Sequence, residues 1–294
     1  MDASSFVFDW LEALHSAGMD PKTILSYRRG IENFISWNRE TYQTAFMPSS
    51  TIGRDVADWK AYQQTVQRAR PATVNQRLAA LGSFFRWAAS QGLVTHNPVD
   101  GIRTLRREQL RPKSLDKRIE RLFLRAVHQS GNLRDIAIVE LLLGTGLRVS
   151  ELLSLKATDL EIDERSGKVV VRKGKHSTYR EIPLTANVRK ALSNYLDQRQ
   201  TQPSASASLW SGQRGGLQDR SAVNRILEKY ALMAQIEPFG PHILRHTFGA
   251  RYLESNPGDL RGLASIFGHR NLNTVMYYTE PSLADLAERM EKME

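Results

Sequence analysis

A cation-rich segment that ends in a proline divides this chain into two parts. Residues 102–112 read IRTLRREQLRP, and the helical pattern stops before them at Asn97-Pro98 and returns at Ser114. Proline interrupts helices and clustered like charges stay solvated, so this segment predicts a linker between folded units. The length of 294 residues allows two modest hydrophobic cores. We therefore expect three parts: an N-terminal domain over 1–102, a linker over 103–113 and a C-terminal domain over 114–294.

The N-terminal part has apolar residues at every third or fourth position, which is the spacing of amphipathic helices. Asp20-Pro21 is typical of an N-cap followed by the first residue of a helix. A second helix is expected to begin near Pro71. The residues expected to point into the core are Ile24, Tyr27, Ile31, Phe34 and Ile35 in the first helix, and Val74, Leu78, Leu81 and Phe85 in the second.

Cationic and polar side chains crowd the first turns of this second helix, and others lie off the apolar stripe of the first. Free backbone amides at a helix N-terminus attract anions, so these side chains suit contacts with phosphate groups. A solvated helix face is the alternative explanation. With two arginines of the linker, the candidate residues for phosphate contacts, which would be the DNA-contacting residues if the partner is nucleic acid, are Lys22, Arg28, Arg29, Arg70, Thr73, Asn75, Gln76, Arg77, Arg106 and Arg107.

The C-terminal part combines helices with one short β segment. Residues 136–143 predict a buried helix that ends at Gly144-Thr-Gly146. Three short runs follow, at 160–162, 169–171 and 179–183, and the turn residues between them predict a small antiparallel sheet. Residues 200–208 are low in complexity and predict a surface loop. The expected fold is mainly α with a small antiparallel β-sheet.

Composition narrows the class of partner and of chemistry. The formal net charge of +10 indicates a polyanionic partner, with nucleic acid favoured over a membrane surface. No stretch approaches the roughly 20 apolar residues that span a bilayer, and the first residues are acidic where a signal peptide is cationic. The absence of cysteine excludes a thiolate nucleophile and a cysteine-based zinc site. We therefore expect a cytoplasmic protein with no membrane partner.

Two arginines and two histidines in the C-terminal part can act on a phosphodiester. Arg148 follows a Gly-x-Gly turn, and Arg245 lies one helical turn after His242; His269 follows a glycine further on. Guanidinium groups match phosphate oxygens and stay charged, so they can stabilise the charge that builds up during phosphoryl transfer. No Asp/Glu cluster with the spacing of a two-metal nuclease accompanies them. We expect neither a metal nor a cofactor.

Residue chemistry alone leaves the nucleophile and the acid undecided. Tyr277 and Tyr278 are adjacent on an expected helix and point about 100° apart, so one can face the basic site while the other packs. A tyrosine at pH 7 is handicapped by about 4 kcal/mol, which cationic neighbours would reduce. Lys173 and Lys175, at the tip of the expected hairpin, both qualify to protonate the leaving 5′ oxygen.

Together these motifs resemble those of the tyrosine recombinases, also called the phage integrase family, and most closely its short Xer-like members. Residues 144–152 resemble the first arginine box, 169–175 the β-hairpin lysine, 241–248 the His-x-x-Arg box and 267–269 the Leu-Gly-His box. The resemblance selects Tyr278, nine residues after the last box, and it favours Lys173. It also assigns Glu151 a supporting role. The implied catalytic residues are Arg148, Lys173, His242, Arg245, His269 and Tyr278.

The resemblance implies a fold and a reaction. A helical, SAM-like core-binding domain and an α+β catalytic domain would clamp duplex DNA at a recombination core site. Cleavage would proceed through a 3′-phosphotyrosyl link, and attack by a 5′-hydroxyl of the partner duplex would give a Holliday junction without ATP or metal. Four protomers would act on two DNA sites, as a homo-tetramer or with a second recombinase, and an accessory protein is compatible with this arrangement.

The C-terminal tail and two differences from the family motifs add to these expectations. A helix over about 281–294 would place Leu283, Leu286 and Met290 on one side and dock on a neighbouring protomer, or alternatively fold back onto its own domain. Phe267 replaces the usual leucine, and Glu280 stands where Xer-like members often have histidine. The implied biology is integration by a small mobile element, or dimer or cointegrate resolution, by a nucleoid-associated bacterial or mobile-element protein.

Two other functions remain open at this level. One is a non-catalytic DNA-binding or architectural protein with the same fold. The other is a mechanistic relative, a type IB topoisomerase or a hairpin telomere resolvase.

Overall fold

The computed structural model describes residues 3–106, 114–172, 179–198, 208–210, 217, 219–268, 273–276 and 290–291. The chain forms two compact units, Met1–Gln109 and Leu110–Glu294. The linker expected over 103–113 crosses the division between them. No described helix is long and apolar enough to span a membrane.

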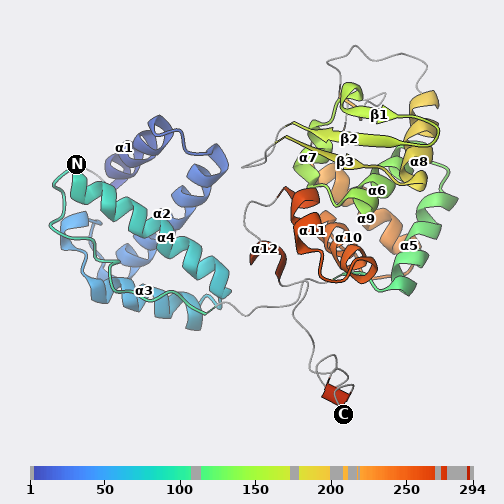
Figure 1. Ribbon diagram of the computed structural model, residues 1–294. Helices are drawn as coiled ribbons and strands as arrows, with labels where there is room; N and C mark the ends of the chain where they lie inside the picture. Colours follow the sequence, from blue (N-terminus) through green and yellow to red (C-terminus); the bar gives the residue numbers. More distant parts are fainter. Residues whose placement is uncertain are drawn as a thin grey trace. The chain divides into compact units, whose positions relative to one another are not determined.

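The N-terminal unit is helical (Figure 1). Its helices are α1 (Ala3–Ser16), α2 (Pro21–Tyr42), α3 (Gly53–Thr65) and α4 (Pro71–Ser90), with a short 3-10 helix, η1 (Pro48–Ser50), between α2 and α3. Aromatic side chains dominate its core, and Trp10, Phe34, Trp59 and Phe84 are fully buried. Helices α2 and α4 approach so closely that a Cβ on Gly30 would lie 2.8 Å from the Cβ of Ala80.

The helix starts in this unit follow the capping rules. Asp20 accepts hydrogen bonds from the backbone amides of Lys22 and Thr23, at 2.9 and 3.2 Å, and Pro21 is the first residue of α2, as predicted. The end of α4 differs from the expectation, because the helix stops at Ser90 rather than continuing to Asn97-Pro98. Gly92 adopts a positive φ of 70° just beyond it, which turns the chain before the proline is reached.

The segment after α4 packs back onto the N-terminal unit. Asn75 donates to the carbonyl of Leu105 at 2.8 Å and accepts from the Leu105 amide at 2.7 Å, so its side chain pairs with the backbone as another peptide group would. Lys60 donates to the carbonyl of Arg103 at 2.7 Å. Contact with this unit therefore extends to residue 105, beyond the border expected at residue 102.

The C-terminal unit surrounds the buried helix α6 (Leu133–Thr145), in the position predicted for a buried helix. The three strands β1 (Leu160–Ile162), β2 (Gly167–Val171) and β3 (Arg180–Pro183) form the predicted antiparallel sheet in the order β1-β2-β3, with Val171 opposite Arg180. The fold is thus mainly α with a small sheet. The other helices are α5 (Lys117–Gln129), α7 (Val149–Ser154), η2 (Ala157–Asp159), α8 (Ala186–Gln198), α9 (Arg220–Met233), α10 (Pro241–Ser255), α11 (Leu260–Phe267) and α12 (Asn273–Met276).

Two packing features of this unit bear on the site. Trp210 is fully buried, stacks on Tyr195 with ring centroids 5.6 Å apart, and donates its indole N–H to the carbonyl of Leu152 at 2.7 Å. A small apolar cluster joins α10, α11 and α12, and Phe267 and Val275 are fully buried in it. The end of α11 is therefore held against α10.

Candidate active site

Arg148 is positioned by a tight connection between two helices. Gly146 caps α6 in the left-handed region, with a φ of 61°, and Arg148 is the N-cap of α7. A Cβ on Gly146 would lie 2.6 Å from the ring of Phe267 and 2.7 Å from that of Phe248, so only glycine fits. The tight turn between α6 and α7 therefore fixes the backbone position of Arg148.

Arg245 reaches the same place from α10. Its side chain is buried; Nη1 donates to the carbonyl of Gly146 at 2.6 Å and Nη2 to the carbonyl of Phe267 at 3.1 Å. The guanidinium carbon lies 3.8 Å from the centroid of the Phe267 ring, which is cation–π geometry. Arg148 Nη1 donates to the same Phe267 carbonyl at 3.2 Å. The two arginines, nearly a hundred residues apart in sequence, thus meet at the C-terminal end of α11.

Glu151 lies behind Arg148 and is fully buried. Its Oε1 accepts from Arg148 Nη1 at 3.0 Å, and its Oε2 accepts from the Arg148 backbone amide at 2.8 Å. Burial raises the pKa of this carboxyl, but the hydrogen bonds and charges of Arg180 and Arg148 outweigh it and lower the pKa below its usual value. Glu151 is therefore ionised at neutral pH.

Arg180 is a further member of this network, and the sequence reasoning missed it. It donates to both oxygens of Glu151, at 3.1 and 2.8 Å, and through Nε to the carbonyl of Ile266 at 2.7 Å. In the strand, Arg180 and Ile182 are buried and alternate with exposed Glu181 and Pro183. An arginine at an inward strand position requires a buried anion, and that requirement was the available signal.

Two histidines of α10 carry no charge at neutral pH. His242 reaches the surface, yet partial burial and the charges of Arg220, Arg245 and Arg148 lower its pKa below the usual value. Partial burial, with His242 and Arg245 nearby, lowers the pKa of His246 to about 4. The ring centroids of the two histidines are 6.4 Å apart. His242 is thus a neutral hydrogen-bonding group beside two permanent cations.

The remaining predicted catalytic residues lie outside the described part of the chain. These are Lys173, His269 and Tyr278; their competitors Lys175 and Tyr277, Glu280, and the tail over 281–294 apart from 290–291 lie outside it as well. The described chain leaves α11 at Gly268, directly before His269, with a φ of 64°. Their placement in the site stays a prediction.

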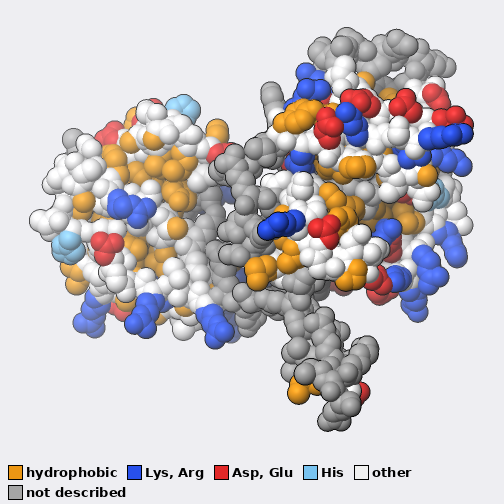
Figure 2. Space-filling view, in the orientation of Figure 1, with side chains coloured by type: hydrophobic (Ala, Val, Ile, Leu, Met, Phe, Trp, Pro, Cys, Tyr) orange, Lys and Arg blue, Asp and Glu red, His pale blue; other side chains and the backbone are white. Residues whose placement is uncertain are grey.

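Some of the candidate DNA-contacting residues are exposed, and most of the others form hydrogen bonds within the protein. Lys22, Arg29, Arg70 and Arg106 are exposed, and exposed Arg28 pairs with Glu32 at 2.7 Å. Lysines, arginines and acidic side chains mix over the visible faces of both units (Figure 2). The other candidates are Asn75, which holds Leu105; Arg77, which donates to Gln63 and Gln67; Gln76, which donates to Ser26; partly buried Thr73; and Arg107, which is not described.

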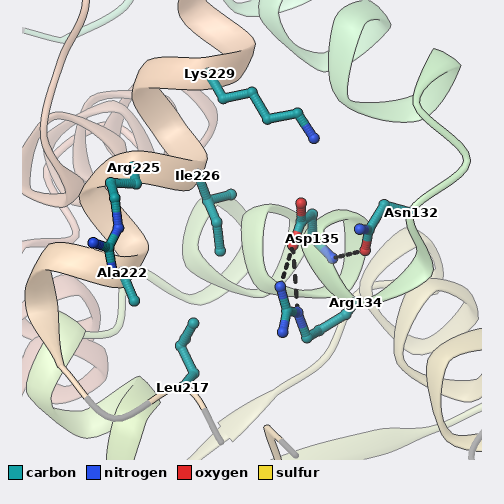
Figure 3. Close-up of a pocket in the computed structure, with 8 residues that line it drawn as sticks. All are labelled: Asn132, Arg134, Asp135, Leu217, Ala222, Arg225, Ile226 and Lys229. Carbon is teal, nitrogen blue, oxygen red and sulfur yellow. Dashed lines mark hydrogen bonds and ion pairs between the residues drawn. The ribbon is translucent and has the colours of Figure 1, made fainter. Parts of the chain in front are cut away.

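A separate cavity of about 410 Å³ lies between the start of α6 and α9 (Figure 3). Helix α6 spans 13 residues, so this cavity lies on the order of 18 Å from the arginine cluster at the other end of that helix. Its buried carboxylate, Asp135, already accepts from Arg134 at 3.3 Å and Tyr230 at 2.9 Å. The cavity contains none of the predicted catalytic residues. Among described residues, no three His, Asp or Glu side chains are grouped to hold a metal ion.

Comparisons with known proteins agree with this arrangement. Residues 113–284 match the model of the Phage integrase family, and residues 6–93 match that of its N-terminal SAM-like domain. The tyrosine recombinase XerC of Pelobacter propionicus is 32% identical over 280 residues, 93% of this chain and 89% of the relative. The TnP I resolvase of Bacillus thuringiensis is 27% identical over 276 residues, 92% of this chain and 93% of the relative.

A solved structure supports the fold. The Tn1549 transposon integrase in complex with a circular intermediate DNA has a TM-score of 0.75 at 21% identity, covering 98% of this chain and 99% of that chain. The family models match both parts of the chain, and the XerC relative aligns along almost all of it. The chain therefore belongs to the phage integrase family and is a tyrosine recombinase.

Proposed function

We propose that this tyrosine recombinase cleaves and rejoins duplex DNA at a specific core site, with Tyr278 as the nucleophile. The observation that carries the proposal is the meeting of Arg148 and Arg245 at the Phe267 carbonyl. Two rigid guanidinium groups so close together suit the non-bridging oxygens of one phosphate. Neutral His242 beside them can donate a hydrogen bond to the same oxygens.

The proposed step balances without a cofactor. The Tyr278 hydroxyl passes its proton to solvent water and its oxygen forms a bond to phosphorus, while the bond from phosphorus to the 5′ oxygen breaks. Lys173 supplies a proton to the leaving 5′ oxygen, and His269 assists the two arginines at the phosphate. One ester replaces another, so the energy of the broken bond stays in the 3′-phosphotyrosyl link. A 5′-hydroxyl of a second duplex can then attack this link, which yields a Holliday junction.

The relatives suggest the setting of the reaction. A XerC recombinase and a resolvase are similar to this chain in sequence, and a transposon integrase in complex with a circular intermediate DNA is similar in fold. We propose duplex DNA as the partner, bound by both units. Four copies would act on two sites, as a homo-tetramer or together with a second recombinase, in the cytoplasm of a bacterium or for a mobile element. The exposed cations Lys22, Arg29 and Arg70 are the proposed phosphate contacts of the N-terminal unit.

Covalent trapping on a complex mixture of DNA sequences tests the proposal and identifies the core site in the same experiment. The full chain is incubated with sheared bacterial genomic DNA in EDTA, and detergent-stable protein–DNA adducts are isolated and sequenced. We expect adducts at a defined core sequence, none with Tyr278→Phe, and normal yield with the matched control Tyr277→Phe. The adduct ends also give the cleavage positions and the spacer.

Other outcomes would replace the proposal. An adduct that survives Tyr278→Phe would refute the assigned nucleophile. Absence of adducts from every DNA, with binding retained, would indicate an architectural protein. Relaxation of supercoiled plasmids that lack any recovered site would indicate a type IB topoisomerase, and hairpin products a telomere resolvase.

A further inference from the structure

Arg180 has its donors turned inward, toward Glu151 and the last turn of α11. Its side chain is only 7% exposed, and it donates to both oxygens of Glu151 and to the carbonyl of Ile266. Arg148 bonds the same carboxylate and is 30% exposed. Of the three side chains, Arg180 and Glu151 are buried, and only Arg148 is substantially exposed. Arg148 can meet a phosphate that approaches from solvent, whereas Arg180 acts through its neighbours.

The charge balance of this trio depends on Arg180. One carboxylate lies between two guanidinium groups, so the three side chains together carry one positive charge. Without Arg180, Glu151 would neutralise Arg148 and bind it with the full strength of a buried ion pair. The carboxylate would then compete with a phosphate for the Arg148 donors.

Arg180 also shapes the end of α11. A Cβ on Gly268 would lie 2.9 Å from Arg180 Nη1 and 3.2 Å from its Cζ, so Arg180 occupies the space that a side chain at 268 would need. Its bond to the Ile266 carbonyl holds the last turn of the helix from the same side. Two features therefore require glycine at position 268: the positive φ of this residue, and the Arg180 side chain that fills the space beside it.

We propose that Arg180 is a positioning residue of the active site, which shares Glu151 so that Arg148 keeps its charge for the phosphate and which fixes the helix end before His269. This inference rests on the proposed function. It assigns a role in the reaction to a buried strand residue that acts through Glu151 and the end of α11.

The test compares Arg180→Gln and Arg180→Lys with the parent chain on duplexes that carry the core sequence recovered from the adducts. Arg134→Gln is the matched control, because it removes a cation that lies 3.3 Å from a buried carboxylate at the opposite end of α6. The readouts are the DNA dissociation constant from gel shifts and the single-turnover rate of adduct formation at saturating protein. Far-UV circular dichroism and thermal melts establish which variants are folded.

We expect Arg180→Gln to slow adduct formation about 10- to 100-fold, the usual effect of removing a residue that orients a catalytic group, with DNA affinity changed less than about threefold. Arg180→Lys should recover part of the rate, since it keeps the positive charge but cannot form the bidentate hydrogen bonds to Glu151. Arg134→Gln should cleave at the parental rate. If the glutamine variant does not fold, the lysine variant carries the test.

A second substrate separates positioning from general damage. A methylphosphonate at the cleavage position replaces one non-bridging oxygen with a methyl group and is neutral, so its cleavage depends less on the charge of Arg148. The difference between variant and parent should shrink to a few-fold on this substrate. Equal slowing on both substrates, or parental rates for folded Arg180 variants, would overturn the inference. Failure of the parent itself to form adducts would instead count against the proposed function.

Discussion

Replacing Gly146 with alanine tests how the α6–α7 turn supports Arg245. The residue has a φ of 61°, so any side chain there costs about 1–2 kcal/mol in the left-handed region. The added Cβ would also lie 2.6 Å from the ring of Phe267 and 2.7 Å from that of Phe248, and such overpacking costs about 1–3 kcal/mol. Together these effects should lower the free energy of unfolding of the C-terminal unit by about 2–5 kcal/mol.

Gly131→Ala is the matched control for this change. Gly131 lies between α5 and α6 with a φ of 64°, and a Cβ there would meet nothing within 4 Å. It should therefore show the backbone strain alone, about 1–2 kcal/mol. Urea denaturation followed by circular dichroism measures both variants, and the difference between them isolates the packing contribution.

The two variants should also differ in activity. The Gly146 carbonyl accepts from Arg245 Nη1 at 2.6 Å, so a shift of this turn should slow adduct formation, whereas Gly131→Ala should leave the rate unchanged. If Gly146→Ala is as stable as Gly131→Ala and cleaves at the same rate, the tight packing around the turn does not matter and the reasoning is refuted.

Two more predictions concern the neighbours of Arg245. Phe267→Leu keeps an apolar side chain but removes the cation–π contact at 3.8 Å, so its single-turnover rate of adduct formation should be several-fold lower than that of the parent. Phe267→Tyr keeps an aromatic ring and should react at a rate near the parent's. Equal rates for the two variants would show that the cation–π contact does not contribute to the reaction. His246 has its pKa lowered to about 4, so the folded state should lose up to about 3 kcal/mol as pH falls from about 6.5 to 4, because protonation favours the unfolded chain. Urea titrations should show this loss reduced in His246→Gln, and an unchanged pH dependence would contradict the assignment.

Local signals in the sequence account well for the secondary structure. The Asp20-Pro21 pair, the turn after α6 and the short β-branched runs each depend on neighbours within a few residues, so their elements could be predicted. The predicted end of α4 was wrong because a glycine with positive φ stopped the helix before the more conspicuous proline. Asn75 shows a related limit, since its hydrogen-bond partner is thirty positions away.

The site residues that belong to sequence motifs could be predicted, whereas contacts between residues distant in sequence could not. Arg148, His242, Arg245 and Glu151 were all proposed from the sequence, and the structure brings Arg148, Arg245 and Glu151 into one network. Arg180 was not proposed, because its role arises only when β3 packs beside α7 and places it against Glu151. A pattern of single residues contains no information about that pairing.

The single tryptophan of the C-terminal unit has a practical consequence for spectroscopy. Four of the five tryptophans, at 10, 37, 59 and 87, belong to the N-terminal unit, and Trp210 is the fifth. Its indole bonds the carbonyl of Leu152, the residue after Glu151, so its emission reports on the helix that positions Arg148. With phenylalanine at the other four positions, the chain would carry a single tryptophan, whose emission can be excited selectively over that of the tyrosines. Stopped-flow fluorescence could then time events at the catalytic unit without an added label.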